Sequence, residues 1–312
     1  MPDFSICGDP SRRHDFLLLF DVTDGNPNGD PDAGNLPRVD PETMHGLVTD
    51  VCLKRKVRNY VAIAKGGREG CEIYVNDQGV ALNTLHEKAY ADAGLAAAGK
   101  KPTRENMLTA RQKMCARYFD VRLFGAVMTT GVNAGQVRGP LQLTFARSVS
   151  PIVPMEVAIT RVAITKAEDA KMVEATDDKQ GSGKTTEMGR KALIPYGLYV
   201  ARGFFTAPFA KQTGVTKDDL ELFWTALMNM WDLDRSAARG LMTCRGLHVF
   251  THEHELGSAP AHVLFDKLEV RPKRDPGTAS GVVESPRAFS DYEVILNRDM
   301  PAGVTLTSLL GK

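Results

Sequence analysis

The sequence lacks the features that mark membrane-spanning and disulfide-stabilised proteins. Its longest obvious apolar run, residues 16–20, suffices for a β-strand but not for a membrane span, which needs roughly 18 residues. The five cysteines are widely separated and include no C-x-x-C pair, which argues against a disulfide framework and a structural zinc site. Residues 1–15 lack the basic start and apolar stretch of a secretory signal. We therefore expect a cytoplasmic protein with free thiols and no membrane partner.

The chain also has little net charge, +1 over 312 residues, but its charges are unevenly distributed. Residues 1–50 have a net charge of −7, residues 51–150 of +9, and residues 151–312 of −1. A basic middle segment can present a positive stripe to phosphate groups while the whole protein stays near neutral. Alternatively, the acidic and basic segments neutralise each other in the fold, and the charge count leaves both interpretations open.

The composition is that of an ordinary globular protein, with 43% hydrophobic and 25% charged residues. Apolar patterning predicts β-strands at residues 16–22, 137–147, 157–165, 193–205 and 246–252, and a hairpin within residues 72–82. Helices are predicted at residues 42–64 and 104–119, and after a Thr216–Asp219 capping box. Without the insertions the order is strand, helix, strand, strand, helix, strand, which is typical of the ferredoxin-like α+β fold. We expect one elaborated domain over residues 1–312, with an insertion at about residues 66–120.

A loop crowded with Gly, Pro, Asn and Asp follows the first predicted strand. Its pattern Asp24-x-Asn26-x-Asn28-Gly29 fits the first half of a calcium-binding loop, where alternate oxygen ligands precede a glycine. The twelfth position, however, is Asn35 instead of a bidentate Glu. We therefore interpret Asn26, Asn28 and Gly29 as residues that shape a rigid turn.

Two further motifs resemble ligand sites and fail on their spacing. Gly183-Lys184-Thr185 matches the tail of a P-loop, but the first glycine of that motif is replaced by Asp178. His252 and His254 stand two residues apart and could share a metal ion on a strand, yet apart from the more distant His262 no further His or Cys has ligand spacing to them. We expect no metal and no cofactor, and we interpret residues 167–190, which are polar and contain glycine, as an exposed excursion.

The first predicted helix carries a cluster of cations. Lys54, Arg55, Lys56 and Arg58 fall within about one turn, and Lys54 and Arg58 form an i, i+4 pair of like charge. An anion between them, such as a phosphate group, would relieve that repulsion, but a solvated helix face explains the cluster equally well. No strand carries the aromatic string of an ordinary base-stacking RNA-recognition motif, so that mode of binding is not predicted.

Three segments together are similar to a family of CRISPR-associated proteins. These are residues 20–32 with Pro37 to Asp40, residues 188–198, and residues 252–265. Through them the chain resembles the backbone subunit of the type I-C Cascade complex, in the "Cas seven" family. The resemblance implies a core like an RNA-recognition motif, carrying helical insertions and a protruding thumb β-hairpin at about residues 166–192.

The resemblance also implies a function in antiviral defence. Such a subunit is not an enzyme: copies of it polymerise as a helical filament along the crRNA and present that guide in segments for pairing with a strand of target DNA. The implied partners are therefore the crRNA, the target strand by way of the guide, further copies of the chain, and the end-capping, large and small Cascade subunits.

The resemblance assigns RNA contacts to residues in three places: the loop with the first helix, one basic strand residue, and the thumb. These residues are Arg38, Thr43, His45, Lys54, Arg55, Arg58, Arg138, Lys184, Arg190 and Lys191. Met188 is the implied apolar wedge between bases, flanked by Lys184, Arg190 and Lys191 for phosphate groups.

An enzymatic alternative comes from related type III backbone subunits, which cleave target RNA with a loop aspartate. The loop of this chain holds Asp24, Asp30 and Asp32, each of which could assist a metal-dependent cleavage of a phosphodiester. Isolated loop carboxylates more often cap turns, so we retain the ribonuclease as the alternative.

Overall fold

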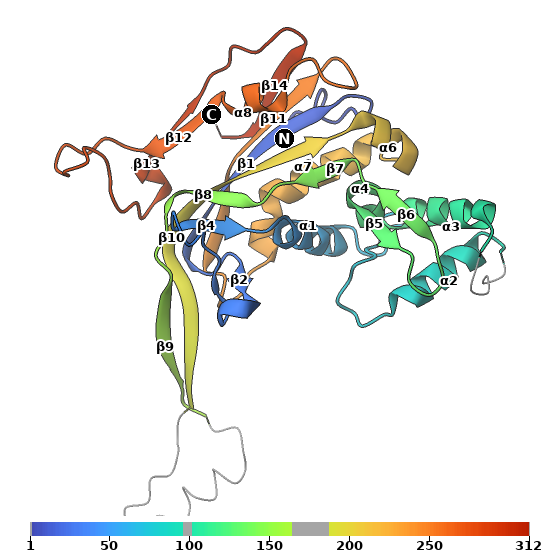
Figure 1. Cartoon of the computed structure of the whole chain (residues 1–312), viewed down its shortest axis with the longest axis horizontal. Coiled ribbons are helices and arrows are strands. Elements are labelled where there is room, and N and C mark those ends of the chain that lie inside the picture. Colours follow the sequence, from blue (N-terminus) through green and yellow to red (C-terminus); the bar gives the residue numbers. More distant parts are fainter. Residues whose placement is uncertain (1, 96–101, 164–186, 312) are drawn as a thin grey trace, which may run out of the picture.

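An antiparallel sheet forms the centre of the protein in a computed structural model that describes residues 2–95, 102–163 and 187–311 (Figure 1). Its strands lie in the order β14–β11–β1–β10–β8–β4, and two further strands, β7 and β9, pair with β10. The bounds are β1 His14–Gly25, β4 His45–Val48, β7 Leu141–Leu143, β8 Ala146–Pro151, β9 Met155–Arg161, β10 Glu187–Phe205, β11 Leu241–His252 and β14 Val304–Leu310.

The middle of the sheet has the predicted ferredoxin-like topology. Helix α1 (Asp50–Ala64) lies in the chain between β1 and β8, and helix α7 (Lys217–Leu233) lies between β10 and β11. The four strands β1, β8, β10 and β11 therefore stand in the spatial order fourth, first, third, second, and each neighbouring pair is antiparallel. The predicted α+β fold class is confirmed.

Helix α7 covers one face of the sheet because its apolar residues recur with helical spacing. Leu220, Phe223, Trp224, Leu227 and Trp231 are all buried, and the predicted capping box at its start is present. The ring of Phe16 on β1 meets Trp224 edge-on at 5.0 Å between centroids, and Phe20 stacks on Trp231 at 4.6 Å. Such aromatic pairs add stability beyond the area that they bury.

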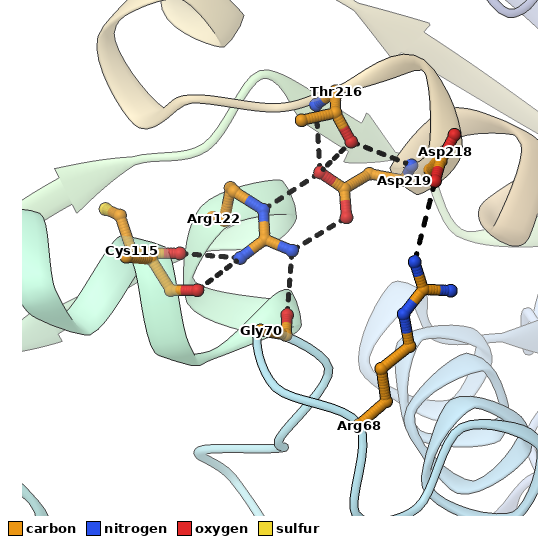
Figure 2. Close-up of polar contacts among 8 residues, drawn as sticks. Arg68, Gly70, Cys115, Arg122, Thr216, Asp218 and Asp219 are labelled. Atoms are coloured by element: carbon orange, nitrogen blue, oxygen red, sulfur yellow. Dashed lines mark hydrogen bonds and ion pairs between the residues drawn. The ribbon is translucent and has the colours of Figure 1, made fainter.

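A helical lobe with its own core occupies one side of the molecule (Figure 1). It contains α2 (Leu82–Asp92), α3 (Arg104–Arg117), α4 (Phe119–Phe124), β5 (Gly125–Met128) and β6 (Gly135–Arg138). Arg122 of α4 joins the lobe to the first turn of α7 by a two-pronged ion pair with Asp219, and it also donates to the carbonyl oxygens of Gly70 and Cys115 (Figure 2). The lobe is thereby held to the core by a buried guanidinium.

The remaining elements are short and surround the sheet and its helices. They are α6 (Ala207–Thr213), α8 (Ala261–Phe265), the two-stranded sheets β2–β3 (Gly29–Asp30, Leu36–Pro37) and β12–β13 (Leu268–Pro272, Tyr292–Leu296), and two short 3₁₀ turns at Pro31–Ala33 and Phe289–Asp291. Leu264 and Phe265 of α8 pack with Leu17 and Leu19 of β1, so α8 covers part of the face opposite α7. Within the described residues, no helix is long and apolar enough to cross a membrane.

The predicted helix at residues 42–64 is wrong at its start. Residues 45–48 form the edge strand β4, which pairs with β8, and Thr49 caps α1 by accepting a hydrogen bond from the N–H group of Cys52. Met44 has a positive φ of 56°, which no helix tolerates. Apart from Gly46, residues 42–48 include no helix breaker, but pairing with a distant strand decides their conformation.

Two strand predictions are also corrected. The predicted hairpin within residues 72–82 does not form, because the buried carboxylate of Asp120 accepts hydrogen bonds from the N–H groups of Tyr74 and Val75 and holds that segment in a loop. The predicted strand at residues 137–147 is divided among β6, β7 and β8. The helix expected at residues 104–119 is present as α3.

Candidate nucleic-acid interface

Strand β10 belongs to two sheets, and this produces a projecting arm (Figure 1). From Ile194 onward it pairs with β1, where Ile194 lies opposite Gly25. From Glu187 to Leu193 it pairs with β9 instead, and Leu193 lies opposite Met155. At about 3.3 Å per residue this two-stranded arm extends roughly 20 Å from the sheet. The predicted thumb falls partly on this arm, at residues 187–192; most of its remainder, including Lys184 and the motif at residues 183–185, lies outside the described residues.

The register of the arm places its functional candidates on different faces. Opposite residues of an antiparallel pair share a face, so Met188 with Thr160 and Arg190 with Ala158 are on one face, whereas Lys191 with Val157 is on the other. The side chain of Met188 is 78% exposed, and that of Arg190 is within 3.2 Å of Glu156 on the same face. Lys191 therefore does not flank Met188, contrary to the prediction.

The loop after β1 is held by the residues predicted to shape it. The side-chain amide of Asn26 donates to the carbonyl oxygen of Asn35, and Oδ1 of Asn28 accepts from both the N–H and the hydroxyl of Thr49 at the start of α1. A Cβ atom on Gly29 would lie 1.9 Å from Oδ1 of Asn35, so a larger residue would force the Asn35 side chain to move. These contacts make the loop a rigid extension of β1 and α1.

Arg38 follows this loop, and part of the hydrogen-bonding capacity of its side chain is unused within the described residues. Its Nε is buried and has no hydrogen-bond partner among the described residues, while its Nη1 lies 3.4 Å from Oδ2 of Asp30. A buried donor without a partner is costly, so such a group indicates a missing ligand or water. The adjoining strand β3 contacts β10, the strand whose first residues form the arm.

Thr43 and His45 lie on the segment that leads to α1. Thr43 is exposed and His45 is half-buried on β4. Nδ1 of His45 is 2.7 Å from the carbonyl oxygen of Ser148, to which it must donate because a carbonyl oxygen only accepts. Arg138 is farther away, on β6 of the helical lobe, where its guanidinium lies 4.4 Å from the ring centre of Phe209.

The cations of α1 point into the protein rather than toward a phosphate group. Arg58 is buried and donates from Nε to Asp120 at 2.7 Å, Lys54 donates to Asp50 at 2.9 Å, and Arg55 donates to the carbonyl oxygen of Val75. Lys56 is also buried, in an ion pair with Asp234. The anions that relieve the like-charge repulsion on this helix are thus carboxylates of the chain itself, and the predicted phosphate-binding role of Arg58 conflicts with its burial.

Residues 12–297 match the family described as CRISPR-associated protein Cas7. The chain belongs to this family. The CRISPR-associated protein Cas7 of Haloferax volcanii is 26% identical over 240 residues, which cover 70% of this chain and 65% of the relative. The match thus spans less than two thirds of that curated relative.

Solved structures of low sequence identity complete the comparison. A chain of a pre-nicking CRISPR RNA-guided surveillance complex has a TM-score of 0.46 and 16% identity, covering 76% of this chain and 78% of its own. A chain of another CRISPR RNA-guided surveillance complex scores 0.43 with 13% identity, covering 76% and 68%. A chain of the type III-B Cmr-beta complex bound to cognate target RNA scores 0.40 with 11% identity, covering 76% and 61%.

One of the three loop carboxylates, that of Asp30, has structural contacts. Oδ1 of Asp30 accepts from the N–H group of Asp32, capping a 3₁₀ turn, and Oδ2 faces Arg38.

The two histidines considered as metal ligands differ in their surroundings. His252 is buried, with Nε2 3.0 Å from Oδ2 of Asp15, whereas His254 is exposed. In the part of the chain that the structure describes, no three His, Cys, Asp or Glu side chains are grouped so that they could hold a metal ion.

Two arginines that were not predicted from the sequence, Arg147 of β8 and Arg202 of β10, line one hollow together with His45. Arg147 donates to Asp40 at 2.7 Å, and this hydrogen bond holds the pKa of Asp40 below its usual value. Strand alternation was the available signal, since Arg147 stands between Ala146 and Ser148, whose small side chains are buried on the opposite face.

Proposed function

We propose that the chain is a non-catalytic backbone subunit of a type I-C CRISPR surveillance complex, binding crRNA in the cytoplasm. The observation that carries the proposal is the side chain of Arg38, whose buried Nε has no hydrogen-bond partner among the described residues. Arg38 adjoins β3, which contacts β10, and the arm that β10 forms exposes Met188. Membership in the Cas7 family supports the same reading. A guanidinium beside an apolar projection suits a nucleic-acid strand, which offers phosphate groups and bases alternately.

Recognition in this proposal is independent of base sequence. The guide varies in sequence, so the protein must hold its sugar-phosphate backbone and leave the base edges to pair with a target strand. Arg38 and Arg190 contact phosphate groups, and Met188 inserts between neighbouring bases. Separation of the guide into short, ordered segments lowers the entropic cost of pairing with target DNA.

Polymerisation supplies the affinity that a single copy lacks. One chain offers few phosphate contacts, because the cations of α1 are paired internally. Copies that bind side by side on one RNA, and that contact the end-capping, large and small subunits, hold the strand through many weak sites at once. The low net charge of +1 lets neighbouring copies touch without strong repulsion.

The mass of the complex as a function of RNA length tests this assembly. The purified full chain is mixed with single-stranded RNAs of increasing length, and each complex is weighed by light scattering. The proposal expects the mass to rise in equal steps of one chain for each added RNA segment of fixed length. A particle of one chain at every RNA length would contradict it.

Incubation with magnesium distinguishes the proposal from the ribonuclease alternative. The RNA-loaded assembly is given complementary RNA and, separately, complementary DNA, and the strands are sized on a denaturing gel. The proposal expects both targets to stay intact, because Asp30 already caps a turn and faces Arg38. Cut RNA that disappears in an Asp24→Ala or Asp32→Ala variant would favour the ribonuclease instead.

A further inference from the structure

A hollow of about 270 Å³ lies on the face of the sheet opposite α7. Its lining includes His45 of β4, Arg147 of β8, Val200 and Arg202 of β10, and Phe265 of α8. Helix α8 and strand β12 cover the neighbouring part of this face and form one wall of the hollow. The volume is at the small end of the range of ligand pockets, about 300–1,000 Å³, and suits one small group rather than a long segment.

The strand register explains why these side chains converge. Arg147 lies opposite Val200, and Arg202 follows Val200 by two residues on the same strand, so the three side chains share one face. Leu17 of β1 lies opposite Arg202 and joins the same face. The sequence thus places two guanidinium groups at the rim of a surface whose floor is aliphatic.

The charge of the hollow is positive. Arg147 and Arg202 are both exposed, and the carboxylate paired with Arg147 is that of Asp40. Arg202 has no ion pair among the described residues; its guanidinium lies 5.9 Å from the ring centre of Phe265. One guanidinium is therefore left without a counter-ion beside an apolar floor, which favours an anionic ligand with an apolar part.

His45 adds a hydrogen-bond acceptor to the lining. Because Nδ1 donates to the carbonyl oxygen of Ser148, the neutral ring keeps its lone pair on Nε2. The 2′-hydroxyl of a ribose can donate to such a nitrogen, whereas deoxyribose has no group at that position. The hollow therefore combines sites for a phosphate group, a planar apolar group and a ribose.

We propose that this hollow binds one unpaired nucleotide of an RNA strand. Its phosphate lies between Arg147 and Arg202, its base rests on Val200 and the neighbouring aliphatic side chains, and its ribose faces His45. This inference rests on the proposed function and adds a second contact region, on the sheet face, to the loop and arm. An acidic protein segment would satisfy the arginines but would leave the acceptor on His45 unused.

Binding of the full chain to fluorescent single-stranded RNA, measured by anisotropy at several salt concentrations, tests the proposal. In an Arg147→Gln/Arg202→Gln double variant we expect affinity to fall about tenfold and the salt slope to shrink by roughly one ion, because the one phosphate group that both arginines contact is no longer neutralised. The matched control is Arg104→Gln, an exposed arginine on α3 of the helical lobe, which should change neither quantity. The His45→Phe variant should lower the preference for RNA over DNA of the same sequence.

Each result separates this inference from the function on which it rests. If the wild type binds RNA and the double variant binds with the same affinity and salt slope, the hollow is not a nucleotide site and the proposed function stands. If the wild type itself does not bind RNA, the proposed function fails. If the double variant alters only the oligomeric state measured without RNA, a protein side chain occupies the hollow and the inference is overturned. Thermal melting of each variant, followed by circular dichroism, confirms that it is folded.

Discussion

Arg122 and Asp219 make two hydrogen bonds across the boundary between the helical lobe and the core. Nε donates to Oδ2 at 2.9 Å and Nη2 donates to Oδ1 at 2.7 Å (Figure 2). The same Oδ2 accepts from the N–H group and the hydroxyl of Thr216, which closes the capping box of α7. One carboxylate therefore fixes both the start of α7 and the position of the lobe.

Removal of this guanidinium should be strongly destabilising. In Arg122→Met the carboxylate of Asp219 stays buried without its partner, and we expect a loss of about 3–5 kcal/mol in the free energy of unfolding, measured by urea denaturation. The matched control is Arg68→Met in the adjacent exposed pair of Arg68 and Asp218, 3.6 Å apart, which should cost less than about 1 kcal/mol. Equal losses in both variants would contradict this role.

The buried Arg58 should act on stability and not on RNA. We expect Arg58→Met to lower the free energy of unfolding by about 3–5 kcal/mol, because Asp120 loses its buried cation. The salt slope of RNA binding by the folded fraction should not change. Arg190→Gln on the arm should do the reverse, with unchanged stability and a smaller slope. A reduced salt slope in Arg58→Met would contradict this prediction and show that Arg58 contributes to RNA binding.

The exposed Met188 should matter for RNA order and hardly for folding. Its side chain packs little in the isolated chain, so Met188→Ala should change the free energy of unfolding by no more than about 0.5 kcal/mol. Chemical probing of the bound RNA should show bases exposed at regular intervals in the wild type and less regularly in the variant. A wild-type footprint without any periodicity would refute the wedge.

Two buried histidines make stability depend on pH. Burial lowers the pKa of His14 and of His248 to about 4, below the ordinary value of 6.5. Between these values the unfolded chain binds more protons than the folded one, so stability falls as the pH falls from about 6.5 to about 4. Each imidazole accounts for about 3 kcal/mol of that loss.

Urea denaturation at a series of pH values measures this dependence. In His14→Phe one of the titrating groups is gone, so the slope of unfolding free energy against pH should be smaller than that of the wild type in this window. The absolute stability of the variant does not enter the comparison. An unchanged slope would show that His14 is not protonated on unfolding.

Local sequence signals predicted the centre of the fold. The apolar run of β1 and the capping box with apolar spacing of α7 each specify their element without distant partners, because propensity, patterning and burial agree there. The order of these elements along the chain then led to the ferredoxin-like topology. Strand patterning also predicted a strand at residues 157–165, which overlaps β9, and the resemblance to the family added that this segment belongs beside a protruding hairpin.

The failures occurred where distant residues decide the structure. Asp120 is 62 residues from Arg58, and its carboxylate both draws that cation inward and prevents the predicted hairpin at Tyr74. A cluster of charges on a helix reads as a solvated or ligand-binding face until its partners are known. The hollow with Arg147 and Arg202 likewise depends on a strand register that sequence alone does not give.

The nucleic acid that purifies with the chain tests the central claim most directly. The full chain is expressed together with a CRISPR repeat-spacer array, purified without nuclease treatment, and the bound RNA is extracted and sized. The account predicts one uniform, repeat-derived RNA that carries several copies of the chain. A single chain free of nucleic acid, which also ignores added RNA at low ionic strength, would contradict it.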